Sequence, residues 1–140
     1  MIRIKILSVG KTKESWLDEA VSEYLKRLQG TILFDFVWVK DDSQLLVNAE
    51  KEDHLIGLDP AGISMTSEQF SEFFAQQALI SGARFAFVIG GPEGLPASLK
   101  KKIPLISLSA MTFTHQIARL ILLEQVYRAT EIQKGSKYHK

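Results

Sequence analysis

The stretch "FAFVIGGPEGL", Phe85 to Leu95, joins a continuous apolar run to a glycine-rich segment. An unbroken apolar run is typical of a central strand that is covered on both faces, as the strands of parallel sheets are. The glycine-rich segment then lies at the carboxyl edge of the sheet, which is where open α/β sheets bind ligands. The stretch therefore predicts an α/β domain with a ligand site at that edge.

Strand-like and helix-like segments alternate through the rest of the chain, which favours a mainly parallel sheet flanked by helices. Strands are predicted at residues 2–9, 32–39, 54–58, 85–89 and 105–108. Helices are predicted at residues 13–29, 66–79 and 114–134, with a short basic helix after the glycine loop.

Two segments fit this alternation less well. Residues 41–52 are short, polar and ambiguous, and "DPAG", Asp59 to Gly62, predicts a tight turn because proline and glycine suit turn dihedrals. No internal repeat or linker divides the 140 residues, so the sequence predicts a single domain over residues 1–140.

The chain contains no cysteine. This excludes disulfide scaffolds, cysteine-ligated metal centres and thiol nucleophiles, and it favours a cytoplasmic protein. The three histidines, His54, His115 and His139, have no metal-like spacing, so no metal is expected. No apolar run approaches the length of a membrane-spanning helix, so no membrane partner is expected.

The net charge of +1 hides an uneven distribution. Residues 1–96 contain nine Lys or Arg and fourteen Asp or Glu, whereas residues 97–140 contain eight and two. The small net charge argues against a protein that coats nucleic acid. The basic C-terminal segment is compatible with an anionic partner, and equally with a solvated basic face.

Two loops are predicted to meet at the carboxyl edge of the sheet. The three glycines in residues 90–94 allow the backbone to approach a ligand, but their spacing matches neither a dinucleotide-binding nor a phosphate-binding motif. The stretch "SLSAMTFTHQ", Ser107 to Gln116, would face this loop if the fifth strand runs parallel to the fourth. The alternative is that the glycines form an ordinary turn and that Thr112 or Thr114 caps the following helix.

The last predicted helix carries apolar residues at helical spacing, which places most of that surface in the core or in a subunit interface. Glu124 and Arg128 are four residues apart and are predicted to form an ion pair. Arg119 lies among the apolar positions, where it would form an interface ion pair or clamp a phosphate. The tail "GSKYHK", residues 135–140, is of a kind that is commonly disordered.

Several segments, taken in order, resemble one known family. They are "IRIKILSVGK" at the start, "LDPAG", "IGGPEGL", the long block "SLSAMTFTHQIARLILLEQVYRA" and the terminal "YHK". Together they span the whole chain and are similar to the RlmH family of ribosomal RNA methyltransferases, in the SPOUT superfamily. Two features depart from the family pattern: Thr114 stands where proline is usual, and the segment between Val39 and His54 is short.

The resemblance implies a SPOUT-type α/β fold, with a mainly parallel sheet flanked by helices and a deep trefoil knot in its C-terminal part. Knots are so rare that the residue pattern alone would favour an unknotted sheet. The resemblance also implies an S-adenosylmethionine-dependent homodimer that methylates N3 of a pseudouridine in helix 69 of 23S rRNA, in assembled 70S ribosomes. The alternatives are a SPOUT methyltransferase that acts on another RNA and a non-enzymatic dimer that binds an adenosine ligand.

The family positions and the glycine loop together give the predicted cofactor-binding residues: Leu58, Gly90, Gly91, Gly94, Leu108, Ser109, Ala110, Met111, Thr112 and Phe113. In the family, the tail of one subunit is expected to complete the pocket of the other. By hypothesis His139 removes the N3 proton, Tyr138 orders the tail, and Lys140 or Arg119 holds phosphate. Methyl transfer to nitrogen needs no cysteine nucleophile, which agrees with the composition.

Overall fold

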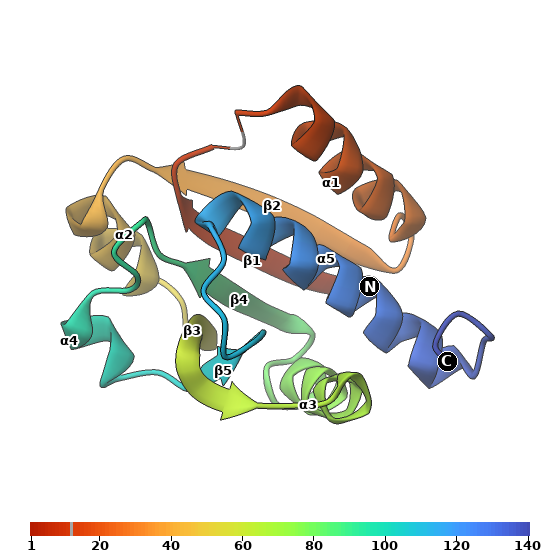
Figure 1. Cartoon of the computed structure of the whole chain (residues 1–140). Coiled ribbons are helices and arrows are strands. Elements are labelled where there is room, and N and C mark those ends of the chain that lie inside the picture. Colours follow the sequence, from red (N-terminus) through yellow and green to blue (C-terminus); the bar gives the residue numbers. More distant parts are fainter. Residues whose placement is uncertain (12) are drawn as a thin grey trace.

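The computed structural model describes residues 1–11 and 13–140 and shows a five-stranded sheet with helices on both faces (Figure 1). The strands are β1 (Ile2–Val9), β2 (Ile32–Val39), β3 (Leu55–Ser64), β4 (Arg84–Ile89) and β5 (Leu105–Ser107). The helices are α1 (Ser15–Arg27), α2 (Asp42–Ala49), α3 (Ser67–Ile80), α4 (Ala97–Lys100) and α5 (His115–Lys134). The strand order is β2-β1-β4-β3-β5, and neighbouring strands are parallel. The predicted α/β fold is confirmed.

The central strand is β4, as its apolar run predicts. Residues 85–89 are almost completely buried because helices pack on both sides of them. On one face, α1, α3 and α5 cover a core in which the rings of Phe74, Phe85 and Phe87 meet edge to face. On the other face, α2 and α4 cover Val88. Successive residues therefore serve opposite cores, as the two-residue period of a strand requires.

Two helices differ from the prediction. α1 is shorter than residues 13–29, and Trp16, which continues its apolar stripe, is 59% exposed. The ambiguous residues 41–52 contain α2. The Asp41 carboxylate caps this helix by accepting a hydrogen bond from the Gln44 N–H at 3.0 Å, while the Gln44 side chain accepts one from the Lys40 N–H. The cap and the bond to Lys40 stabilise a short helix that periodicity alone does not reveal.

The prediction of a tight turn at "DPAG" is wrong. β3 continues through these residues, with a register shift against β5 between Leu58 and Ile63. Pro60 is tolerated because it lies in this bulged stretch, where the ladder to β5 is interrupted. The Asp59 carboxylate accepts a hydrogen bond from the Ala61 N–H at 2.8 Å, so a turn-like side-chain bond forms inside an extended strand.

Helices α3 and α5 pack against each other along a polar seam. The Ser67 hydroxyl donates to the side-chain oxygen of Gln125 at 2.8 Å, and the buried Ser71 hydroxyl donates to the Ala129 carbonyl at 3.0 Å. α3 begins with a capping box formed by Thr66 and Gln69. The seam fixes the start of α3 against the middle of α5. None of the described helices is both long and apolar enough to cross a membrane.

Candidate functional site

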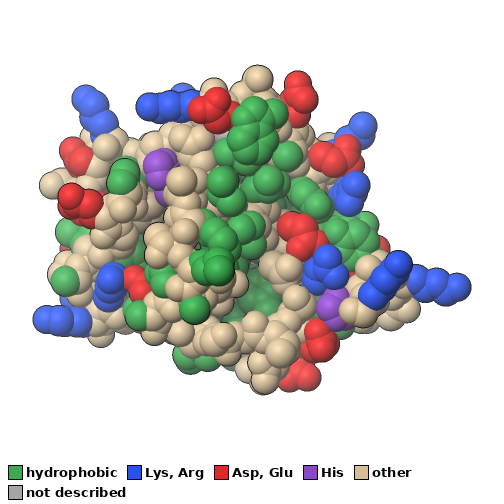
Figure 2. All heavy atoms as spheres, in the orientation of Figure 1, with side chains coloured by type: hydrophobic (Ala, Val, Ile, Leu, Met, Phe, Trp, Pro, Cys, Tyr) green, Lys and Arg blue, Asp and Glu red, His purple; other side chains and the backbone are tan. Residues whose placement is uncertain are grey.

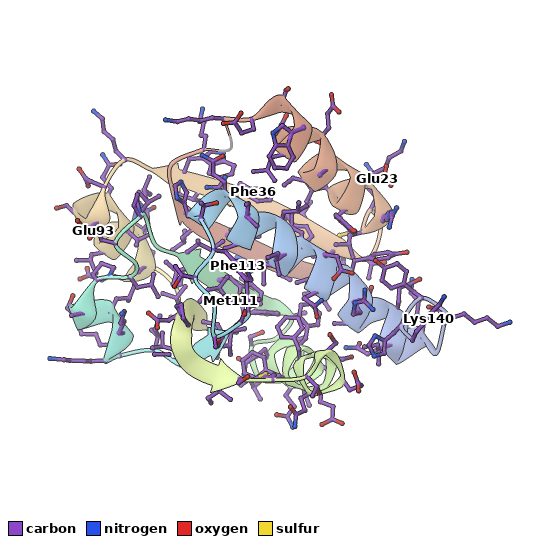
Figure 3. The ribbon with its side chains drawn as sticks, viewed as in Figure 1. Glu23, Phe36, Glu93, Met111, Phe113 and Lys140 are labelled. Carbon is purple, nitrogen blue, oxygen red and sulfur yellow. The ribbon has the colours of Figure 1, made fainter. Side chains whose placement is uncertain are left out.

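A cavity of about 660 Å³ opens at the carboxyl edge of the sheet, where the sequence predicts a ligand site. Its walls come from the bulged part of β3, the glycine loop after β4 and the segment between β5 and α5. The first turns of α1 and α5 add further lining residues. Figure 3 shows Glu93 on the glycine loop, and Met111 and Phe113 on the segment that leads into α5.

The structure brings almost all of the predicted cofactor-binding residues to this cavity. Those that line it are Leu58, Gly90, Gly91, Gly94, Leu108, Ser109, Met111, Thr112 and Phe113. Ala110 belongs to the same segment but is exposed and is not among the lining residues. The three segments are far apart in sequence, and the parallel order β4-β3-β5 brings their carboxyl ends together.

The glycine loop owes its shape to its glycines. A Cβ added to Gly90 would lie 2.5 Å from the carbonyl oxygen of Gly94 and 2.7 Å from the backbone nitrogen of Leu95. Gly94 has a φ of 84°, in the left-handed region that favours glycine. The Gly94 N–H donates to the carbonyl of Gly91 at 3.0 Å, which closes the loop on itself. The loop can therefore present its backbone at the cavity wall only with glycine at these positions.

The hydroxyl groups between β5 and α5 hold that segment in place. The Ser107 hydroxyl donates to the Ser109 carbonyl at 2.8 Å, and the Ser109 hydroxyl accepts from the Met111 N–H at 3.0 Å. Thr114 is the N-cap of α5 and accepts from the Ile117 N–H at 3.3 Å, so one of the two predicted capping threonines is confirmed. Local hydrogen bonds therefore account for much of the polarity of this junction.

Several other lining residues are not among the predicted cofactor-binding residues. They are Glu14, Trp16, Leu17, Asp59, Pro60, Ile89, Pro92, Thr114, His115, Gln116, Ile117 and Ala118. Two of these residues, Trp16 and Ile117, are large apolar side chains that are exposed, as is Met111 among the predicted cofactor-binding residues. Figure 2 shows apolar side chains gathered down the middle of this face of the molecule. Trp16 gives no separate signal in the sequence, because it continues the apolar stripe of α1.

Asp59 is a buried carboxylate in the β3 wall of the cavity. Burial by itself would raise its pKa. Hydrogen bonds from the Lys100 ammonium, 2.9 Å away, and from the Ala61 N–H outweigh the burial and leave the pKa below its ordinary value. The carboxylate is therefore ionised at neutral pH and ties β3 to α4.

His115 lines the cavity from the first turn of α5. Burial lowers the pKa of its imidazole, and repulsion from Arg119 and Lys13 lowers it further. The positive end of the helix dipole acts in the same direction. The imidazole is therefore neutral at pH 7.

Arg119 lies inside the fold, with no exposed surface. Its guanidinium donates to the Ser8 hydroxyl at 2.9 Å and to the Gly10 carbonyl at 2.7 Å, and it stacks 4.5 Å from the centroid of the Trp38 ring. Burial lowers its pKa to about 10, so it remains charged at pH 7. The predicted phosphate contact needs correction, because a fully enclosed guanidinium cannot reach a phosphate in this conformation.

The tail after α5 packs back against its own chain. The Tyr138 hydroxyl donates to Glu124 at 2.9 Å, and its ring meets the Tyr127 ring edge to face at 4.8 Å. Burial raises the pKa of Tyr138, and the hydrogen bond to Glu124 raises it further, so the phenol stays protonated. Glu124 also forms the predicted ion pair with Arg128, at 3.1 Å. His139 contacts Arg128 through Nδ1 at 2.9 Å and Glu68 of α3 through Nε2 at 2.8 Å.

The cavity and the tail lie at opposite ends of α5. This helix has 20 residues, so its ends are about 30 Å apart. Figure 3 shows Lys140 at the edge of the molecule, away from Met111 and Phe113 near its middle. Within one chain, the structure therefore does not bring the predicted catalytic tail to the predicted cofactor-binding residues.

Comparison with known proteins identifies the family. The model described as predicted SPOUT methyltransferase matches residues 2–139. The ribosomal RNA large subunit methyltransferase H of Protochlamydia amoebophila is 55% identical over 140 residues, which cover the whole of both chains. The chain belongs to the RlmH family of SPOUT methyltransferases. A second RlmH relative, from Coprothermobacter proteolyticus, is 39% identical over 140 residues, covering 99% of this chain and all of the relative.

Solved structures of lower identity share the fold of this RlmH chain. A probable methylase family protein from Haemophilus influenzae Rd KW20 has a TM-score of 0.60 at 11% identity, over 99% of this chain and 70% of the other. A Legionella pneumophila structure in complex with the bound cofactor SAM has a TM-score of 0.52 at 13% identity, over 92% of this chain and 66% of the other. At these identities the likeness concerns the fold alone.

Proposed function

We propose that this RlmH chain is an S-adenosylmethionine-dependent methyltransferase that acts on N3 of a pseudouridine in helix 69 of 23S rRNA, in the assembled 70S ribosome. The observation that carries the proposal is the cavity at the carboxyl edge of the sheet, which gathers all but one of the positions assigned to the cofactor. The 55% identical relative is named as a methyltransferase of large-subunit ribosomal RNA, which supports the substrate class.

The cavity suits S-adenosylmethionine in size and chemistry. A volume of about 660 Å³ falls in the range of small-molecule sites, which combine apolar walls with a few polar groups. Leu108, Met111 and Phe113 offer apolar surface, and the glycine loop offers backbone groups. S-adenosylmethionine supplies a methyl group on a sulfonium cation. In the wall, Asp59 is ionised but paired with Lys100, and His115 is neutral, so neither adds a net positive charge that would repel the sulfonium cation.

A homodimer would complete the site. The tail and the cavity of one chain are separated by the length of α5, so the tail that serves this cavity belongs to a second chain. Trp16, Met111 and Ile117 surround the cavity with large exposed apolar side chains, at 59, 74 and 39% exposure. Apolar surface of this kind is typical of a protein interface. We therefore propose that a second copy of the chain packs here and brings its Tyr138, His139 and Lys140 to the cavity.

The chemistry of the proposed site rests on positioning and proton removal. The cavity and the partner's tail hold N3 of the pseudouridine in line with the methyl group, and alignment of this kind can contribute several kcal/mol. His139 accepts the N3 proton, and a base so placed contributes roughly 10²–10⁴-fold. Tyr138 anchors the tail through Glu124. Lys140 is exposed and supplies a charge for phosphate.

In this proposal Arg119 supports the cavity wall and does not bind phosphate. Its bonds to Ser8 and Gly10 tie α5 to the end of β1, beside the first turn of α5 that lines the cavity. Arg119 therefore positions the wall of the cavity and leaves phosphate contacts to the exposed cations.

The proposed substrate explains the weak charge of the protein. With a net charge of +1, the chain cannot hold bare RNA by phosphate neutralisation alone, so we expect weak affinity and a shallow salt dependence on isolated rRNA. A composite surface of the assembled ribosome would supply the missing contacts. The same proposal includes the trefoil knot in the C-terminal part and a cytoplasmic location, where ribosomes work.

Transfer of labelled methyl from S-adenosylmethionine to purified ribosomes that lack this methylation tests the proposal. We expect label in 23S rRNA with 70S ribosomes and little with isolated rRNA or transfer RNA. Label in transfer RNA would favour a SPOUT enzyme with another substrate. Cofactor binding without any transfer would favour the non-enzymatic adenosine-binding dimer.

Mixed dimers test whether the tail acts on the partner. One parent is Gly90→Ala, which disturbs the cavity, and the other lacks residues 138–140. If tails act in trans, the heterodimer contains one intact site. At an S-adenosylmethionine concentration too low to fill the Gly90→Ala cavity, a random mixture of the two parents should therefore recover about a quarter of wild-type activity. No recovery, with heterodimers present, would show that each tail serves its own chain.

A further inference from the structure

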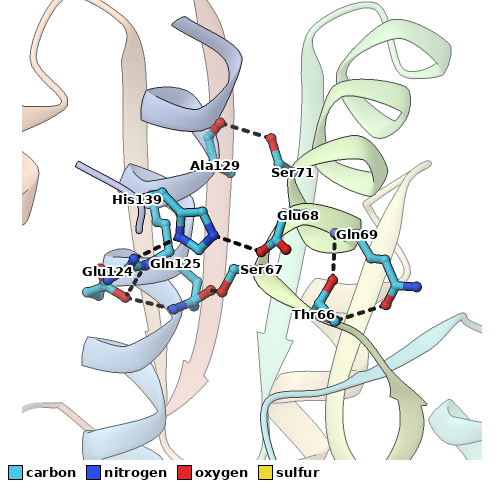
Figure 4. Close-up of polar contacts among 10 residues, drawn as sticks. Thr66, Ser67, Glu68, Gln69, Ser71, Glu124, Gln125, Ala129 and His139 are labelled. Atoms are coloured by element: carbon cyan, nitrogen blue, oxygen red, sulfur yellow. Dashed lines mark hydrogen bonds and ion pairs between the residues drawn. The ribbon is translucent and has the colours of Figure 1, made fainter. Parts of the chain in front are cut away.

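The start of α3 carries a carboxylate that faces the tail. The seam between α3 and α5 places Glu68 opposite the residues that follow α5, and Figure 4 shows Glu68 and His139 pointing toward each other across this seam. Glu68 Oε1 lies 2.8 Å from His139 Nε2. Glu68 is 63% exposed on its side chain, whereas the His139 side chain is 24% exposed. The surroundings of His139 therefore include Glu68, which lies 71 positions away in the chain.

The two contacts of His139 select one form of its ring. Arg128 Nη1, 2.9 Å from Nδ1, can only donate a hydrogen bond, so Nδ1 must accept and cannot carry a proton. The Glu68 carboxylate can only accept, so Nε2 must carry the proton and donate it. The ring between them is therefore the neutral Nε2–H tautomer. Glu124 is a further charged group near this pair, and it is bound to Arg128 and Tyr138.

We propose that Glu68 is a positioning residue for His139 and that Arg128 covers the basic nitrogen of that ring until RNA binds. The inference rests on the proposed function, in which His139 accepts the N3 proton. Glu68 fixes the tautomer in which Nδ1, and not Nε2, is the proton acceptor. Arg128 occupies the Nδ1 lone pair in the free protein, so the base is exposed only when Arg128 moves.

The surroundings of Arg128 suit such a movement. Its guanidinium also pairs with the Glu124 carboxylate and stacks 4.9 Å from the centroid of the Tyr138 ring, so it keeps these two contacts when it leaves His139. A phosphate oxygen is a stronger acceptor for a guanidinium than a neutral imidazole nitrogen, because the bond is assisted by opposite charges. A backbone phosphate of the RNA would therefore draw Arg128 from Nδ1 as the substrate docks.

The proton and electron balance of the step is complete. The N3 electron pair forms the new bond to the methyl carbon as the carbon–sulfur bond breaks and its pair returns to sulfur. The N3 proton moves to Nδ1 of His139, so the positive charge that leaves sulfur ends on the imidazolium. The Glu68 carboxylate, bonded to Nε2–H, faces this new charge and stabilises it. Solvent removes the proton after the product leaves.

The test combines a spectroscopic measurement with steady-state kinetics on the intact dimer. Nitrogen chemical shifts of His139 report its tautomer in wild type, Glu68→Gln and Glu68→Ala. We expect the Nε2–H tautomer in wild type and in Glu68→Gln, whose side-chain carbonyl can still accept, and a mixture of tautomers in Glu68→Ala. Glu72→Ala, one turn further along α3 and exposed, is the matched control and should leave the tautomer unchanged.

Methyl transfer to 70S ribosomes supplies the second readout. Glu68→Ala should lower kcat at least about tenfold, part of the contribution of a general base, with the KM for S-adenosylmethionine unchanged. Glu68→Gln should lie between it and wild type, because it keeps the tautomer but not the charge. An active wild type with an equally active Glu68→Ala, or an Nδ1–H ring in wild type, would overturn the inference alone. A wild type that methylates no RNA would overturn the proposed function and the inference with it.

Discussion

Gly90→Ala tests whether the glycine loop needs glycine at this position to keep its shape. The added Cβ would lie 2.5 Å from the Gly94 carbonyl oxygen and 2.7 Å from the Leu95 nitrogen, and closer still to the Gly94 carbonyl carbon. These are backbone atoms, so no side-chain rotation relieves the clash. Overpacking costs about 1–3 kcal/mol, and rigid neighbours place this case near 2–3 kcal/mol.

This free energy can appear as weaker cofactor binding, as lower folding stability, or as both. If the loop moves to relieve the clash, the cavity changes shape and the affinity for S-adenosylmethionine falls. Since 1.4 kcal/mol is a factor of ten, a loss of about 2–3 kcal/mol corresponds to roughly 30- to 150-fold weaker binding. If the loop holds, the same energy appears as a lower free energy of unfolding. Calorimetric titration with S-adenosylmethionine and urea unfolding together measure both parts.

Gly91→Ala is the matched control for the stability part. Its Cβ would meet only the Val9 side chain, at 3.3 Å, and a side chain can shift by a few tenths of an ångström. We expect it to lose less than about 1 kcal/mol of folding stability. The reasoning is refuted if Gly90→Ala keeps both the stability and the cofactor affinity of the wild type.

Three further predictions concern the residues around α5. Arg119→Ala should lose about 1–3 kcal/mol or more in urea unfolding, because it leaves the buried Ser8 hydroxyl and the Gly10 carbonyl without their donor. The exposed Arg3→Ala should stay within about 0.5 kcal/mol, and equal effects would contradict this. The lowered pKa of His115 means that the folded state disfavours the cation, so unfolding free energy should fall as pH drops below about 6.5, and His115→Gln should flatten that slope. Tyr138→Phe should cost about 1 kcal/mol or less in stability by losing its bond to Glu124, yet should reduce turnover in the methylation assay without weakening cofactor binding.

The arrangement of the sheet follows closely from local patterns in the sequence. β1 and β2 begin and end where alternation and β-branched residues predict, and the unbroken apolar run of β4 marks the central strand. The course of β3 could not be predicted, because "DPAG" has the composition of a turn. Only the pairing with β5 on both sides of the bulge makes these residues part of a strand. That pairing depends on contacts that are distant in sequence.

The site could be predicted only in part, because some of its contacts join residues that are distant in sequence. The glycine loop and the segment before α5 carry a local signal, and parallel strands place both at one edge. The burial of Arg119 depends on Ser8 and Gly10, more than 100 positions away, and no local pattern reveals it. The contact between Glu68 and His139 likewise needs the packing of α3 on α5. A motif can mark the tail as functional, but it cannot say which carboxylate faces it.

Analysis of the methylated nucleoside distinguishes methylation at N3 of a pseudouridine from methylation at any other position. Ribosomes with pseudouridine in helix 69, and matched ribosomes with unmodified uridine there, would be incubated with the protein and S-adenosylmethionine. Their 23S rRNA would then be digested to nucleosides for mass spectrometry. We expect N3-methylpseudouridine from the first ribosomes and no methylated product from the second. A methyl group on a ribose oxygen, or equal methylation of both ribosomes, would contradict it.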